Sequence, residues 1–331
     1  MSPAAGATAV RERPTSPVTQ RAVAFVAQHK PAAEDLGRSL AELTGDPEAF
    51  ARALNEGLAT LADAEYLEGQ RRIAPGIGDV IGVRWPLIEA VKRGFRESTR
   101  GDRTSTWLFV ADRLLREPPL EPRWFSFGML ERTIEDEPER TWQLVRRAAR
   151  EASDWITVDA LAHVAGKGIL NEAYRWAELE QLVYSPSRWE RRLVGSTVAT
   201  TPFVDHRRGR EPIVATNGLS LVGQLIGDDE PDVQKALSWG LRSLVIVDAG
   251  AVTAFVTDET ETASATGDGH RAWVIRDTLP KLDAATAADL RARLDGIRRK
   301  PGAPSTSQAA ATAAAFAGMG LGREMPEPPL I

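Results

Sequence analysis

Two residues in the segment SDWITVDALAHV, residues 153–164, combine an aromatic ring with a carboxylate. Trp155 and Asp159 are four positions apart, so on a helix their side chains share one face. An aromatic face attracts a cation, and so does an ionised carboxylate. A single tryptophan on a helix is nevertheless most often a core residue, and a single aspartate is most often solvated. The pair alone therefore leaves two interpretations open, a site that handles a cation or ordinary packing.

Three further segments place aromatic and basic residues at helical spacing. In DDEPDVQKALSWGLRSL, Lys235 and Trp239 are four apart and share a face. In SPSRWERRLVGS, Arg191 and Arg192 follow Trp189. The segment IGVRWPLIEAVKRGF is basic through Arg84, Lys92, Arg93 and Arg96. Each of these segments, taken singly, is also explained by core tryptophans and solvated charges.

Composition excludes several classes of protein. The 331 residues include no cysteine, which rules out disulfides and thiolate metal sites, and only four histidines, so we expect neither a metal nor a cofactor. No apolar run approaches the roughly 18 residues of a membrane span, and the N-terminus lacks a signal-peptide pattern. We therefore expect a cytoplasmic bacterial protein without membrane contact, acting at the nucleoid, and a monomer.

The net charge of −5 conceals a strong local pattern. Residues 1–68 carry a net charge of −4, residues 69–116 of +5 and residues 188–210 of +4. The acidic average argues against a nucleic-acid partner, whereas the basic middle of the chain favours one. Scattered solvated charge also explains these counts.

Helical patterns dominate the chain between its two ends. Segments such as DPEAFARALNEGLATLAD and PDVQKALSWGLRSLVIV place apolar residues three and four apart, and several begin at a proline. The helices recur in pairs every 35–45 residues without a strict repeat. This pattern predicts an all-α fold, an α-solenoid of HEAT-like helical repeats with a concave face.

The same patterns divide the chain into four parts. Residues 1–16 are predicted to be a disordered N-terminus, and residues 17–74 a helical N-terminal extension. Residues 75–300 form the predicted HEAT-like repeat domain. Residues 301–331 are predicted to be a flexible C-terminal tail with little to pack against.

Taken in order, the motifs resemble those of the AlkD-like DNA alkylation repair family. The resemblance rests on Trp-x-x-x-Asp at residues 155–159, Trp-x-Arg-Arg at 189–192 and DVQKALSWGLR at 232–242, with GVRWPLI upstream. It covers roughly residues 75–255, and DVQKALSWGLR is its most specific part. The segment LEPRWFSFGMLER departs from the family pattern, and the N-terminal helices exceed the usual length of the family.

The resemblance implies a DNA glycosylase that excises positively charged N3- or N7-alkylated purines from duplex DNA. It implies a basic concave groove, and a reaction that does not flip the base into a pocket. By position, Trp155 and Trp239 would flank the deoxyribose and Asp159 would be the catalytic carboxylate. Arg192 would contact the DNA backbone, with Arg191 as the alternative if the register is shifted by one. Lys235 and Arg84 are further candidate DNA contacts.

The implied chemistry agrees with the residue types. An alkylated cationic purine is already a good leaving group, so the sugar, which becomes oxocarbenium-like, is what needs stabilisation. A fixed carboxylate stabilises that charge and can orient a water molecule. Each aromatic face adds on the order of 0.5–2 kcal/mol. The alternative is a non-catalytic HEAT-like module that binds DNA or protein, which the acidic balance and the long termini favour.

Overall fold

The protein is all-helical in the computed structural model, which describes residues 16–74 and 77–318, with side chains to residue 315. Within these residues there are sixteen α-helices and no strand, apart from one isolated bridge between Ala62 and Val83. The prediction of an all-α fold is confirmed. None of the helices described is long and apolar enough to cross a membrane.

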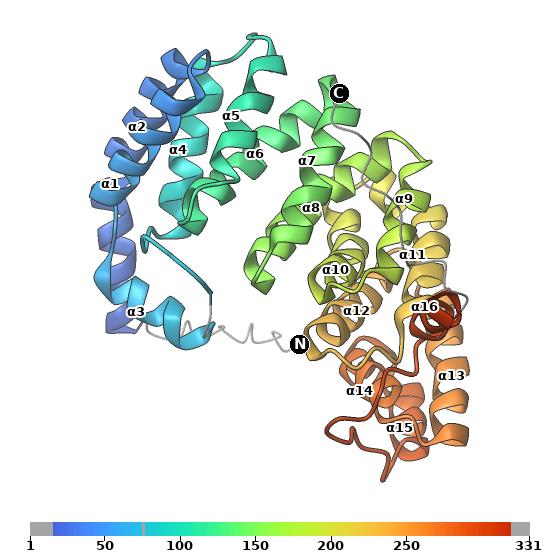
Figure 1. Ribbon diagram of the computed structural model, residues 1–331. Coiled ribbons are helices and arrows are strands. Elements are labelled where there is room, and N and C mark those ends of the chain that lie inside the picture. Colours follow the sequence, from blue (N-terminus) through green and yellow to red (C-terminus); the bar gives the residue numbers. More distant parts are fainter. Residues whose placement is uncertain (1–15, 75–76, 319–331) are drawn as a thin grey trace, which may run out of the picture.

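Four helices form the N-terminal end of the molecule. They are α1 (Pro17–Leu40), α2 (Pro47–Thr60), α3 (Ala64–Ile73) and α4 (Trp85–Ser98). Helix α1 lies along α4 (Figure 1), and two glycines allow the close approach. A Cβ atom on Gly37 would lie 2.0 Å from the Val91 carbonyl oxygen, and one on Gly94 would lie 2.1 Å from that of Glu34. The predicted N-terminal extension therefore packs directly on the first helix of the predicted repeat domain.

The remaining helices alternate between two layers. One layer holds α6 (Leu120–Asp136), α8 (Trp155–Asn171), α10 (Arg188–Val204), α12 (Pro231–Leu244) and α14 (Gly269–Thr278). The helices that alternate with them are α5 (Trp107–Leu114), α7 (Pro138–Glu151), α9 (Arg175–Gln181), α11 (Pro212–Leu225), α13 (Ala249–Thr266) and α15 (Ala284–Arg293).

Each helix of the first layer packs on the next, from α6 through α14, and the elements follow an arc in Figure 1. This arrangement is consistent with an α-solenoid. The core runs between the layers and contains large, fully buried side chains such as Trp124, Trp142 and Phe125. Val158 and Leu161 of α8 are also fully buried, as their helical spacing predicts. The apolar residue Ile156 is also predicted from the sequence to face this core, but it is only partly buried, because it lines the same cavity as Trp155.

The C-terminal segment packs against the preceding helices for part of its length. Sequence patterns predicted little for it to pack with, yet Ser307 and Ala309 are each only 2 % exposed. Thr306 donates its backbone N–H to the Gly227 carbonyl at 2.9 Å, and α16 (Gln308–Gly318) packs on α11. Residues 319–331 lie outside the described residues, as does the predicted disordered N-terminus except Ser16, whose side chain caps α1.

Candidate functional site

Helix α8 begins at the tryptophan of the opening motif because the preceding residue caps it. The Asp154 carboxylate accepts hydrogen bonds from the Thr157 backbone N–H at 2.8 Å and from the Thr157 hydroxyl at 2.7 Å. Burial of the carboxyl raises the pKa of Asp154 above its ordinary value. Trp124 of α6 donates its indole N–H to the Thr157 hydroxyl at 3.3 Å. Trp155 is thereby fixed in the first turn of α8, where it is 39 % exposed.

Asp159 lies one turn further along α8 and is held from α10. Arg192 donates from Nε to Oδ1 at 3.1 Å and from Nη2 to Oδ2 at 2.8 Å. Ser196 donates its hydroxyl to Oδ1 at 2.6 Å. The Asp159 side chain retains 18 % exposure, whereas that of Arg192 retains only 6 %. The carboxylate is therefore held rigidly by charge-assisted hydrogen bonds while one side of it remains accessible.

Asp159 lines a cavity of about 480 Å³, together with residues that the sequence singled out and residues that it did not. Trp155, Asp159 and Trp239 all line it, so the structure brings the three predicted catalytic residues to one place. Trp85 and Trp124 contribute further aromatic walls. The other charged or titratable side chains of the wall are Glu89, Lys92, Arg96, Glu131 and His163. Such a cavity offers aromatic faces and a fixed carboxylate to a cation, as well as ammonium and guanidinium groups to an anion.

Two of the tryptophans in this wall were not selected from the sequence. Trp85 is 40 % exposed, and its ring centroid lies 6.0 Å from that of Trp124. The Lys92 ammonium stands over the Trp85 ring at 4.9 Å and pairs with Glu89 at 3.0 Å. A signal was present in the sequence, because Trp85-x-x-x-Glu89 repeats the spacing of Trp155-x-x-x-Asp159.

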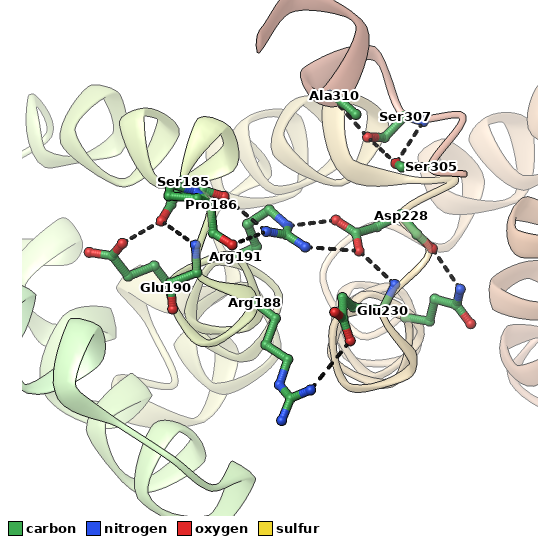
Figure 2. A network of polar contacts seen from close by, with 12 residues as sticks. Ser185, Pro186, Arg188, Glu190, Arg191, Asp228, Glu230, Ser305, Ser307 and Ala310 are labelled. Atoms are coloured by element: carbon green, nitrogen blue, oxygen red, sulfur yellow. Dashed lines mark hydrogen bonds and ion pairs between the residues drawn. The ribbon is translucent and has the colours of Figure 1, made fainter. Parts of the chain in front are cut away.

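Arg191 is directed to a different place from its neighbour Arg192. Its Nε donates to Asp228 Oδ2 at 2.7 Å, and its Nη1 donates to the carbonyl oxygens of Ser185 and Pro186 (Figure 2). The side chains of Arg191 and Asp228 are 14 % and 3 % exposed. In this structure Arg191 therefore joins the loop before α10 to the loop before α12.

The other predicted DNA contacts differ in their surroundings. Arg84 precedes α4 and donates to Asp63 Oδ2 at 2.7 Å, with both side chains largely buried. Its guanidinium also stands over the Tyr66 ring at 5.0 Å. Lys235 is exposed on α12, one turn before Trp239. Of these two cations, Lys235 is the one whose ammonium is accessible to a ligand.

The family model described as DNA alkylation repair enzyme matches residues 54–277. The chain belongs to this family. The match runs from α2 to α14 and includes every residue of the cavity wall. Membership supports a role in DNA repair and implies DNA as a partner. Among curated proteins none matches the chain.

In the part of the chain that the structure describes, no group of three or more His, Cys, Asp or Glu side chains is arranged to hold a metal ion.

Proposed function

We propose that the protein is a DNA glycosylase that excises positively charged N3- or N7-alkylated purines from duplex DNA. The observation that carries the proposal is the presence of Trp155, Asp159 and Trp239 in the wall of one cavity, in a chain of the alkylation repair family. The cavity lies among α4, α6, α8 and α12. We propose that the helical stack is a HEAT-like solenoid and that this cavity belongs to its concave, DNA-binding face.

The proposed reaction is hydrolysis of the N-glycosidic bond without base flipping. The alkylated purine departs as the bond breaks, and positive charge develops on the deoxyribose. Asp159 stabilises that charge and orients the attacking water, while the rings of Trp155 and Trp239 stabilise the cation through their faces. Cationic lesions are selected because their glycosidic bond is already weakened. Sequence-independent contacts to phosphate then suffice for DNA binding.

Arg192 has two roles in this proposal. In the unbound protein its guanidinium pairs with Asp159, donates to the Asp232 carbonyl at 2.6 Å and lies 6.0 Å from the Trp155 ring centroid. It therefore orients the carboxylate directly. Its contact with the DNA backbone remains a prediction, since its Nε, Nη1 and Nη2 atoms all donate to groups within the protein.

Release of 7-methylguanine and 3-methyladenine from methylated duplex DNA tests the proposal. Asp159→Asn is expected to bind DNA as the wild type does but to lose most excision, by roughly 100-fold or more, because an amide cannot stabilise the developing charge. Single-turnover assays with saturating protein measure the rate, and a parallel binding titration measures the affinity. Full activity of Asp159→Asn would show that another group is the catalytic carboxylate.

The alternative function, a non-catalytic module that binds DNA or protein, is favoured by one specific observation. Asp277 of α14 is paired with Arg242 and accepts a hydrogen bond from Ser238 at 2.7 Å, both on the neighbouring α12. The trio has the same residue types as Asp159, Arg192 and Ser196, with serine and arginine in the opposite order, and it joins two packed helices, so such a trio can be purely structural. DNA binding that weakens steeply with salt, without release of either base, would support this alternative.

A further inference from the structure

A polar seam runs through the contact between α8 and α10. It is formed by residues at intervals of four on α10, namely Arg192, Ser196 and Thr200. Arg192 and Ser196 both donate to Asp159, whereas the acceptors of the Thr200 hydroxyl are backbone carbonyls, among them that of Ser196 at 3.0 Å and that of Ala162 at 3.1 Å. Ser196 and Thr200 are at most 1 % exposed. Two equally buried hydroxyl groups, one turn apart, therefore differ in whether they touch the carboxylate.

The acceptor positions of Asp159 show what the serine adds. An ionised carboxylate offers about four lone-pair positions, two on each oxygen. Oδ1 accepts from Arg192 Nε and from the Ser196 hydroxyl, and Oδ2 accepts from Arg192 Nη2. Three positions are thereby filled, and the remaining one is on Oδ2. Without Ser196, a second position would become vacant on Oδ1, and the two oxygens would no longer differ.

We propose that Ser196 is a positioning residue that makes Oδ2 of Asp159 the oxygen presented to the sugar cation or to water. The inference rests on the proposed glycosylase function. Ser196 acts only through Asp159, since its hydroxyl is fully buried and is not part of the cavity wall. The other charged or titratable groups near the carboxylate are Arg192 of α10 and the cavity residues Glu89, Lys92, Arg96, Glu131 and His163. The described donors to Oδ1 of Asp159 are Arg192 Nε and the Ser196 hydroxyl, and none of these cavity residues is among them.

Ser196→Ala tests the role, with Thr200→Val as the matched control. Each change removes one buried hydroxyl from the same seam and leaves the other in place. Ser196→Ala is expected to slow single-turnover excision by roughly 10-fold to 100-fold at saturating protein, with unchanged affinity for methylated DNA, because a hydrogen bond to a charged group is lost. Thr200→Val is expected to keep the wild-type rate. Thermal unfolding of both variants shows that they are folded.

A spectroscopic measurement on the free protein separates this inference from the proposed function. The ¹³Cγ resonance of Asp159, assigned by its disappearance in Asp159→Asn, is expected to move in Ser196→Ala and to keep its position in Thr200→Val. If the wild type excises no base and the resonance still behaves in this way, the glycosylase proposal fails. The conclusion that Ser196 positions the Asp159 carboxylate then still stands. An unchanged excision rate in Ser196→Ala, or an equal loss in Thr200→Val, overturns the positioning role.

Discussion

The basic residues of this protein fall into two groups, those that hold the fold together and those that remain accessible to a ligand. Arg84 and Arg191 belong to the first group, because each is largely buried against an aspartate. Lys235 belongs to the second, since it is exposed on the helix that carries Trp239. Residue type and spacing did not distinguish the two groups. They are distinguished by burial and by the presence of a carboxylate partner.

Lys235→Ala is expected to weaken DNA binding, whereas Arg84→Ala is expected to weaken the fold. Each phosphate contact contributes roughly 0.9 to the slope of log affinity against log salt concentration, so Lys235→Ala should reduce the magnitude of that slope by about 1. Arg84→Ala should leave the slope unchanged and lower the free energy of unfolding, because Asp63 loses its partner. Affinity titrations over a range of salt concentrations measure the slope. A reduced slope for Arg84→Ala alone would reverse the assignment.

At the scale of elements, α10 connects three successive parts of the stack through adjacent arginines. Residues next to each other on a helix point in directions about 100° apart. Arg192 therefore turns toward Asp159 of α8, while Arg191 turns toward Asp228 in the loop before α12 (Figure 2). One helix thus positions a candidate catalytic carboxylate and anchors the loop before α12.

Arg191→Ala is expected to destabilise the fold without changing the chemistry. Removing one partner of a buried ion pair costs about 3–5 kcal/mol, and Asp228 would be left buried without its cation. Urea unfolding measures the loss. Excision by the fraction that is still folded should keep the wild-type rate, whereas Arg192→Ala should slow excision itself. A slow but fully stable Arg191→Ala would instead make Arg191 the functional arginine.

Over the whole molecule, the acidic N-terminal segment neutralises part of the basic segment that follows it. Glu34 pairs with Arg93 at 3.1 Å and Glu48 with Arg113 at 2.7 Å, in addition to the pair between Asp63 and Arg84. The opposite net charges of residues 1–68 and 69–116 thus meet across packed helices. Part of the acidic charge of the N-terminal segment is therefore used in ion pairs within the protein.

The C-terminal segment stabilises the last helices. The Thr306 hydroxyl donates a hydrogen bond to the Asp268 carboxylate that caps α14, and the Thr306 backbone N–H donates to the Gly227 carbonyl. Ending the chain after Ala303 should therefore lower the thermal midpoint by a few degrees, because these bonds and the packing of α16 are lost. Excision at low temperature should persist, since the cavity residues lie on α4 through α12. Unfolding scans and excision assays on the truncated chain check both expectations.

Local patterns in the sequence determined the helices and the order of the motifs. Apolar spacing and proline starts depend only on neighbouring residues, so the all-α fold could be predicted. Fixed spacing also predicted that Trp155 and Asp159 share a face. The family resemblance placed Trp239 with them, more than 70 residues further along the chain.

The tertiary structure alone decided which side chains are engaged by partners far away in the sequence. Ser196, 37 residues from Asp159, had no motif to mark it, and Trp124 reached the cavity only because α6 packs beside α8. Arg84 and Arg191 were predicted as DNA contacts because the spacing of an arginine in the sequence does not show whether it forms an ion pair with an aspartate. Burial and ion pairing are properties of packed helices, and they appear only when helices distant in sequence come together.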